Sequence, residues 1–396
     1  MNRTSRCLIC TGVLIALPVF AQFTSGSTGS DGPLDYTGKC PNNSVVFNPA
    51  AFTPPLDPAG DNVFNFTTIT IPNNCEVKLL QSVLNGPVIW LATGAVTIGG
   101  GATLNLGGAS GGPSFPTSLR VLATPGAGGY PGGAASGSSP AGPGFGPGGG
   151  IPCASGVQAT GGKYTGNLFA IPLVGGSGGG GCNTGGGAGG GAILIASSTQ
   201  IQNGGVINVP GGSGPCGGAA AGGSGGAVRL VAPSVSAGTI NAYGGNNGCN
   251  GNNAGSAGAI RIESFNNPGG NFPGNNGSNP TVTYGSPFNT FVTASQVPTI
   301  KVVSVNGVPV TQPATGSFQM PDVTINTGSP VTLQIQASQV PVGTVAALLF
   351  FSDNGPDMTV NSTPLAGTLA ASTATATVTF PAGYTRGFVS ASFTPQ

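Results

Sequence analysis

The chain has 396 residues, and its 74 Gly and 35 Pro make up more than a quarter of it, where about 12% is usual. Only 5% of the residues are charged, with ten Lys or Arg against nine Asp or Glu, and histidine is absent. This composition excludes an ordinary helical enzyme, a nucleic-acid binder that depends on clustered cations and a chain kept disordered by its net charge.

Residues 1–21 have the pattern of a secretory signal. Arg3 and Arg6 precede an apolar run that ends at Ala21 with the small residues of a cleavage site. The run contains Pro18 and is shorter than the roughly 20 apolar residues that a membrane span needs. We therefore expect cleavage after Ala21, a secreted or cell-surface protein, and no integral membrane segment after cleavage.

Apolar segments of similar pattern recur along the next 270 or so residues, each directly after a glycine: 87–92, 192–196, 227–232 and 259–263. The first three are each followed by a second short segment that ends in Gly-Gly: 103–108, 206–212 and 239–245. The starts at 192, 227 and 259 are 35 and 32 residues apart, and the interval from 87 to 192 equals three such repeats, with a weaker copy at 119–123. Short strands at this period predict a parallel, β-helix-like β-solenoid, which we assign to residues 22–290.

The alternation within these strands predicts which side chains face the core. Ile193, Val228 and Ile260 occupy equivalent positions and should stack in neighbouring coils. The intervening position is charged at Arg229 and Arg261, so we expect that face to point outward.

A recurring asparagine marks the second strand of each repeat. Asn105, Asn208 and Asn241 are equivalent and either form an amide ladder along the stack or serve a tight bend; the pattern favours neither.

A long low-complexity insertion spans about residues 124–190 and carries one apolar island at 168–174. It is either a flexible loop or a set of extended polyproline-II segments packed closely through glycine. Its aromatic residues anchor the insertion on the solenoid or stack on sugars; they are Tyr130, Phe145, Tyr164 and Phe169.

The segments 64–108, 192–198 and 227–232, with the glycine-rich tract between them, resemble exported glycine-rich bacterial proteins with β-helix-like repeats, most of them uncharacterised. The resemblance covers roughly residues 24–290. It implies an extracellular or envelope location and carries over no functional residue.

Residues 297–396 differ in composition and contain alternating strands separated by turn residues, at 299–305, 322–326, 331–337, 344–352, 373–380 and 387–393. This number of strands predicts an Ig-like β-sandwich that folds independently. The segment resembles bacterial Ig-like modules in architecture, although it lacks their Cys and Trp.

Catalytic groups are scarce. Glu263 is the only acid between Val77 and Pro321, whereas a glycosidase needs two carboxylates. The absence of histidine excludes Ser-His and Cys-His nucleophiles. Arg261 and Glu263 lie at i and i+2 on one strand, and we expect a surface ion pair.

Six cysteines remain after cleavage, without a C-x-x-C motif, and in an exported chain they indicate disulfides. Cys216 and Cys249 follow the equivalent Asn208 and Asn241 at equal distances, which predicts a bridge between adjacent coils. Elimination then pairs Cys40 with Cys75 and Cys153 with Cys182. In the alternative, Cys182 takes one of the later cysteines as its partner.

Two acidic turns are weak Ca²⁺ candidates, one with Asp57 and Asp61 and one with Asp353 and Asp357. Both lack the longer ligand series of an EF-hand, and Asp is common in turns. We expect no other cofactor.

Together these features predict a non-enzymatic surface or extracellular-matrix protein with a structural or adhesive role, whose partners are glycans or other surface proteins and not nucleic acid. Two alternatives remain: a polysaccharide lyase or hydrolase on a β-helix scaffold, and a carbohydrate-binding or ice-binding solenoid.

Overall fold

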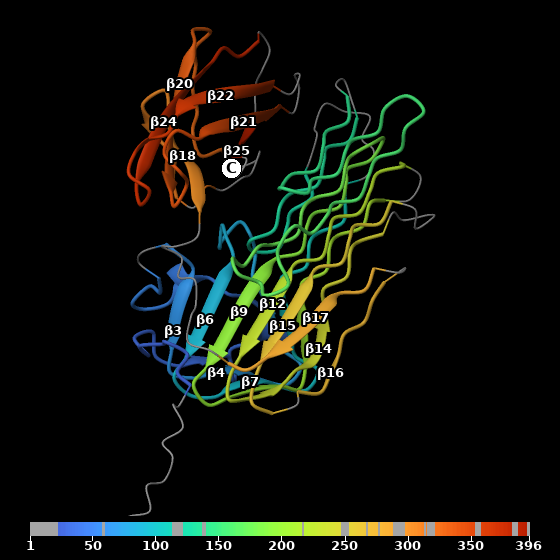
Figure 1. The fold of residues 1–396 in the computed structure, drawn as a ribbon, viewed down its shortest axis with the longest axis vertical. Helices are drawn as coiled ribbons and strands as arrows, with labels where there is room; N and C mark the ends of the chain where they lie inside the picture. Colours follow the sequence, from blue (N-terminus) through green and yellow to red (C-terminus); the bar gives the residue numbers. More distant parts are fainter. Residues whose placement is uncertain are drawn as a thin grey trace, which may run out of the picture.

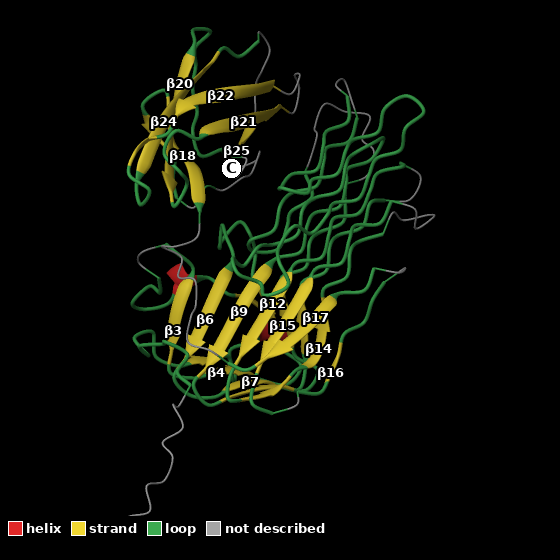
Figure 2. Cartoon of the chain, in the orientation of Figure 1, coloured by secondary structure: helices red, strands yellow, loops and turns green. Residues whose placement is uncertain are grey.

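The computed structural model describes residues 23–57, 60–112, 122–136, 140–215, 218–246, 253–266, 268–275, 278–287, 298–312, 314, 321–352, 358–381 and 387–393. Apart from the short 3-10 helices η1 (Pro41–Asn43) and η2 (Pro49–Ala51), every regular element in these ranges is a β-strand (Figure 2). The predicted all-β class is confirmed, and the predicted signal at 1–21 lies outside the described residues.

No helix in these ranges has the length and apolar character that a membrane-spanning helix requires.

Three parallel sheets, which we call A, B and C, form the first unit (Figure 1). Sheet A contains β1 (Leu34–Asp35), β4 (Ile69–Ile71), β7 (Val96–Ile98), β10 (Gln200–Asn203) and β13 (Ser234–Ser236). Sheet B contains β2 (Ser44–Val46), β5 (Glu76–Lys78), β8 (Thr103–Asn105), β11 (Val206–Asn208), β14 (Gly238–Asn241) and β16 (Gly270–Asn271). Sheet C contains β3 (Val63–Phe66), β6 (Val88–Ala92), β9 (Ala192–Ser197), β12 (Ala227–Val231), β15 (Ala259–Glu263) and β17 (Thr281–Gly285).

From β6 to β15 the chain visits sheets C, A and B in rotation, and each strand pairs with the strand of the same sheet one turn earlier. Val228 lies opposite Ile193 on one side and Ile260 on the other, in parallel register, and all three are fully buried. The predicted stacking of these residues is therefore confirmed.

Aromatic rings close the core at its N-terminal end. The Phe47 ring lies 4.9 Å from that of Phe64 and 5.3 Å from that of Trp90, measured between centroids, and all three side chains are fully buried. Burying each such side chain contributes about 1.5–3 kcal/mol to the free energy of folding, so this cluster stabilises the first turns.

The interval between the first two repeats is not made of further turns. β6 pairs directly with β9, with Val88 opposite Ile193. Residues 119–121 of the weaker copy lie outside the described residues, and Leu122 and Ala123 belong to no strand. The predicted coil at 119–123 is thus wrong for its described part, and the described residues between 106 and 191 lie outside the three sheets.

The outer face of sheet C is also not exposed as predicted. Arg229 is fully buried and Arg261 is 7% exposed. Apolar residues from elsewhere in the chain, including Phe23, Ala170 and Leu173, pack on this face. The apolar island of the insertion supplies two of these three residues, which explains why an alternation rule based on the strands alone failed.

The second unit has antiparallel sheets with a hydrophobic core of its own. One sheet has the order β19 (Val308–Pro309), β18 (Thr299–Val305), β20 (Val331–Ser338), β24 (Ser372–Val378), β23 (Ala366–Gly367). The other has the order β22 (Met358–Pro364), β21 (Val345–Ser352), β25 (Gly387–Ser392). The strand predicted at 322–326 is absent from its described residues, and β22 was not predicted.

Candidate functional site

The glycine-rich segments form a hydrogen-bonded array, seen in Figure 2 as long runs without strand assignment that lie side by side. The segment 185–191 shows its geometry. Gly185, Ala188 and Gly191 donate their backbone N–H groups to one neighbouring segment, at Gly112, Ala109 and Leu106. Gly186 and Gly189 donate to a second segment, at Gly133 and Tyr130, and Gly187 and Gly190 donate to a third, at Ala221 and Ser224.

The same rule holds one turn later. In the segment 221–226, residues three apart again donate to the same neighbour, and three different neighbours are used. A period of three with no hydrogen bonds inside a segment is the signature of polyproline II. Of the two interpretations of the insertion, packed extended segments match the described residues, and the flexible loop does not.

Glycine is needed in the array because the backbones touch. A Cβ atom at Gly187 would lie far inside the contact distance of the Gly212 carbonyl group, and one at Gly226 would overlap the Gly191 carbonyl oxygen. Neither position has a positive φ, so the requirement is space and not backbone conformation. The array interior therefore consists of paired peptide groups with almost no side chains.

Three of the four aromatic side chains of the insertion are buried or half-buried. Phe145 is 4% exposed, Tyr130 and Tyr164 are half-buried, and burial raises the pKa of Tyr164 to about 12. Phe169 differs, because it is 57% exposed and lies beneath the Arg261 guanidinium, 5.2 Å from ring centroid to Cζ. Tyr164 packs on the outer face of sheet C, as predicted for an anchor on the solenoid. Phe145 and Tyr130 instead pack with each other and with Leu122, Ala134 and Leu349, and Phe169 is the most exposed of the four rings.

A buried cluster of two arginines and one glutamate lies on the outer face of sheet C. Arg229 donates from Nε and Nη2 to the two carboxylate oxygens of Glu263, at 3.2 Å each, and Arg261 donates from Nε to Glu263 Oε1 at 3.1 Å. The side chains of Arg229, Arg261 and Glu263 are only 1%, 9% and 0% exposed. The predicted ion pair between Arg261 and Glu263 is present, but its predicted location on the surface is wrong, because the pair is buried and includes a second arginine.

This cluster fastens strands together and leaves no oxygen of Glu263 open for acid or base chemistry. Arg229 belongs to β12 and Glu263 to β15, while Arg261 Nη1 also donates to the backbone oxygen of Tyr284 on β17, at 2.7 Å. Sequence reasoning missed Arg229, although its register opposite Arg261 was a usable signal.

Polar side chains on sheet B are linked in short pairs. Asn241 donates to Asn208 Oδ1 at 2.6 Å, as in a ladder. Asn105 instead donates to Glu76 Oε1 at 2.7 Å and accepts from the Gly107 N–H at 2.9 Å, as in a bend. Both interpretations of the recurring asparagine therefore hold, at different turns.

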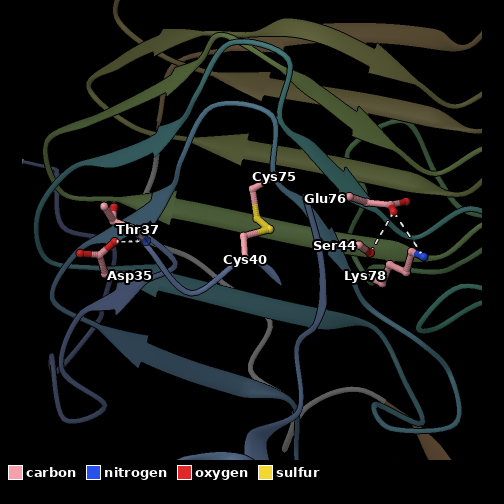
Figure 3. Close-up of a disulfide and its surroundings, with 7 residues drawn as sticks. All are labelled: Asp35, Thr37, Cys40, Ser44, Cys75, Glu76 and Lys78. Carbon is pink, nitrogen blue, oxygen red and sulfur yellow. Dashed lines mark hydrogen bonds and ion pairs between the residues drawn. A yellow bond between two sulfur atoms is a disulfide. The ribbon is translucent and has the colours of Figure 1, made fainter. Parts of the chain in front are cut away.

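Glu76 is a surface acid with several side-chain partners. Ser44 and Lys78 contact its Oε2 at 3.2 and 3.3 Å (Figure 3). Partial burial acts to raise its pKa, but the hydrogen bonds from Asn105 and Lys78 outweigh it and hold the pKa of Glu76 below its usual value. A carboxyl group with a lowered pKa is ionised at neutral pH and is a poor proton donor.

The structure contains the disulfides Cys40–Cys75 and Cys153–Cys182, with Cα separations of 5.9 and 5.1 Å. These are the two pairs that elimination assigned. The first joins the segments that lead into β2 and β5, which are paired strands of sheet B (Figure 3). Cys216 and Cys249 lie outside the described residues, but the register on which their pairing rests, Asn208 opposite Asn241, is present.

In the first candidate calcium turn, the carboxylate oxygens accept hydrogen bonds from backbone N–H groups. Asp57 accepts the N–H groups of Asp61 at 3.1 Å and Asn62 at 2.7 Å, and Asp61 Oδ1 accepts that of Val63 at 3.0 Å. Burial raises the pKa of Asp57 to about 6. The geometry is that of a hydrogen-bonded turn.

The second candidate turn, with Asp353 and Asp357, lies outside the described residues. In the described part of the chain, no group of three or more His, Cys, Asp or Glu side chains is placed to hold a metal ion. Comparison with protein-family profiles, with curated proteins and with solved structures finds no match to this chain.

Proposed function

We propose that this chain is an exported, non-enzymatic surface or extracellular-matrix protein with a structural or adhesive role. In this proposal the three parallel sheets form a β-solenoid from which the glycine array projects, and the antiparallel unit is an Ig-like sandwich that serves as a spacer. The observation that carries the proposal is the array, in which successive residues of one segment hydrogen-bond to three neighbouring segments.

An array of this kind suits mechanical and adhesive work. Its interior has no charge and no reactive side chain, so its cohesion comes from peptide hydrogen bonds worth about 0.5–1.5 kcal/mol each. Two disulfides support it and the first turns, and such bonds persist in oxidising compartments. These features favour a protein that works outside the cell.

The competing enzyme hypothesis is disfavoured by the state of the carboxylates. Glu263 is buried and bound by two guanidinium groups. Glu76 is engaged by Asn105, Lys78 and Ser44. Neither carboxylate is free to act as a general acid.

The test combines fractionation, activity and adhesion. Cells that express the full chain should release it into the medium or carry it on their washed surface, and beads coated with the purified chain should retain cell-surface material. The Gly187→Ala variant, which disrupts the array, should lose retention, whereas Gly269→Ala, where a Cβ meets nothing within 4 Å, should keep it.

Two results would contradict the proposal. One is recovery of the chain solely from the cytoplasm. The other is release of unsaturated or reducing ends from a polysaccharide that stops in the Glu263→Gln variant.

A further inference from the structure

The last strand of sheet C ends the core with an exposed aromatic ring. In register, Tyr284 continues the column of core side chains formed by Trp90, Ile195, Leu230 and Ile262. Those four are fully buried, but Tyr284 is 51% exposed. Exposed aromatic surface beside a hollow is typical of a binding site, and a polar side chain at this position would end the core equally well.

The opposite end of sheet C is covered. There the edge strand β3 is bonded to the preceding segment, because Asp31 donates its N–H to the Asn65 carbonyl oxygen at 2.9 Å and accepts the Asn65 N–H with its carboxylate. Phe64 on the same strand is fully buried. Of these two rings at the ends of sheet C, only the one on β17 is exposed.

Tyr284 and Phe265 border a hollow of about 440 Å³, lined also by Ser264, Pro268 and Ser286. Phe265 is 63% exposed. This volume falls within the roughly 300–1,000 Å³ of small-molecule sites. The described lining contains no charged side chain.

The backbone that carries the two rings is held in place before any ligand binds. Tyr284 is fixed by the pairing of β17 with β15. The Phe265 N–H donates to the Pro233 carbonyl oxygen at 3.1 Å, and the Asn266 side chain both accepts from and donates to the backbone of Val235, at 2.9 Å each. A site arranged in advance loses less entropy on binding.

We propose that this hollow binds a neutral sugar unit of an extracellular glycan, an inference that rests on the proposed adhesive function. A sugar presents an apolar C–H face to an aromatic ring and hydroxyl groups to polar neighbours. Phe265 and Tyr284 supply the rings, and the hydroxyl groups of Ser264 and Ser286 lie in the same lining. The Ser264 hydroxyl already donates to the Asn266 carbonyl oxygen at 2.9 Å and can still accept a hydrogen bond from a sugar. A wholly apolar ligand would leave the exposed Ser286 hydroxyl without a partner, and an ionic ligand would find no counter-charge among the described lining residues.

A second copy of the chain fits the same surface less well. Strand addition at β17 would need its outward backbone groups, and the Arg261 guanidinium already occupies the carbonyl oxygen of Tyr284. Blocked edges of this kind oppose strand pairing between molecules.

The test is calorimetric titration of the purified mature chain with three neutral probes, cellohexaose, hexa-N-acetylchitohexaose and mannohexaose. We expect binding of at least one, weakened about tenfold or more by Tyr284→Ala and by Phe265→Ala. Tyr284→Phe, which keeps the ring, should retain binding. The matched control is Ile151→Ala, because Ile151 is also highly exposed, at 64%, but is not part of the lining. Unchanged Trp90 fluorescence shows that each variant is folded.

Three results would overturn the site. They are no binding of any probe, binding that survives in the Tyr284→Ala, Phe265→Ala double variant, and a dimer in sedimentation that Tyr284→Ala dissociates while no sugar binds. If coated beads still retain cell-surface material in the double variant, the adhesive function stands and only this site is wrong. Loss of adhesion together with exclusively cytoplasmic recovery would instead remove the function itself.

Discussion

Replacing Gly187 by alanine should destabilise the first unit by about 2–5 kcal/mol. The new Cβ would overlap the Gly212 carbonyl group, and even the third-nearest atom, the Ser213 carbonyl carbon, would be 3.0 Å away. The backbones must therefore separate, and overpacking of this kind costs about 1–3 kcal/mol. Separation also weakens the bonds from Gly187 N–H to Ala221 at 2.9 Å and from Gly212 N–H to Ala188 at 2.8 Å, each worth about 1 kcal/mol.

Urea unfolding followed by the fluorescence of Trp90 measures this effect. Trp90 is the only tryptophan and is fully buried in the core of the parallel sheets, so it reports the first unit alone. The matched control is Gly269→Ala, which should stay within about 1 kcal/mol of the parent, because alanine also restricts the unfolded chain. Equal unfolding midpoints for the Gly187 and Gly269 variants would refute close packing of the array.

Three further outcomes are expected. Glu263→Gln should lower the free energy of unfolding in urea by about 3–5 kcal/mol, because it leaves buried guanidinium groups uncompensated. Arg261→Gln should lower it less, since the remaining Arg229–Glu263 pair is neutral. The reverse order would contradict the cluster. Burial raises the pKa of Asp57 from 3.8 to about 6, so the folded chain holds this proton more tightly than the unfolded chain. That stabilisation is complete below pH 3.8 and is lost as the pH rises to 6, a slope that Asp57→Asn should flatten; a slope unchanged in the variant would assign it to another group. Non-reducing peptide mapping should join Cys216 to Cys249, and any other partner for Cys216 would disprove the pairing.

The sequence predicted four of the six strands of sheet C, because these apolar segments recur at a regular period after a glycine, and three of the six strands of sheet B, which follow them. Sheet A was missed. Its strands, such as Ile69–Ile71 and Val96–Ile98, are as short as those of sheet B, but they do not share a recurring residue such as the asparagine that marks equivalent positions in sheet B. The burial of Arg229 could not be read from its own strand, because residues that pack on the same face, Ala170 and Leu173, come from the insertion. Chain segments far apart in sequence decide exposure, and alternation within one strand does not record them.

The array was hardest to predict because its pattern is carried by the backbone. A strand shows its period of two in its side chains, whereas an extended glycine segment has a period of three that appears only in where its N–H groups point.

The two patterns meet at the glycine directly before each of the strands β9, β12 and β15. A Cβ at Gly258 would overlap the Gly226 carbonyl oxygen, and one at Gly226 would overlap that of Gly191. Neighbouring strands lie about 4.8 Å apart, and segments that enter them at this spacing leave no room for a side chain directed along the stack. Strand pairing thus imposes the close approach that continues into the array, and the array in turn holds the register of the sheets, because Gly226 N–H donates to Val209 and Gly191 N–H donates to Leu106. A substitution in the array should therefore also destabilise the sheets. We expect Gly187→Ala to shift the unfolding transition reported by the fluorescence of Trp90, which lies in sheet C and not in the array.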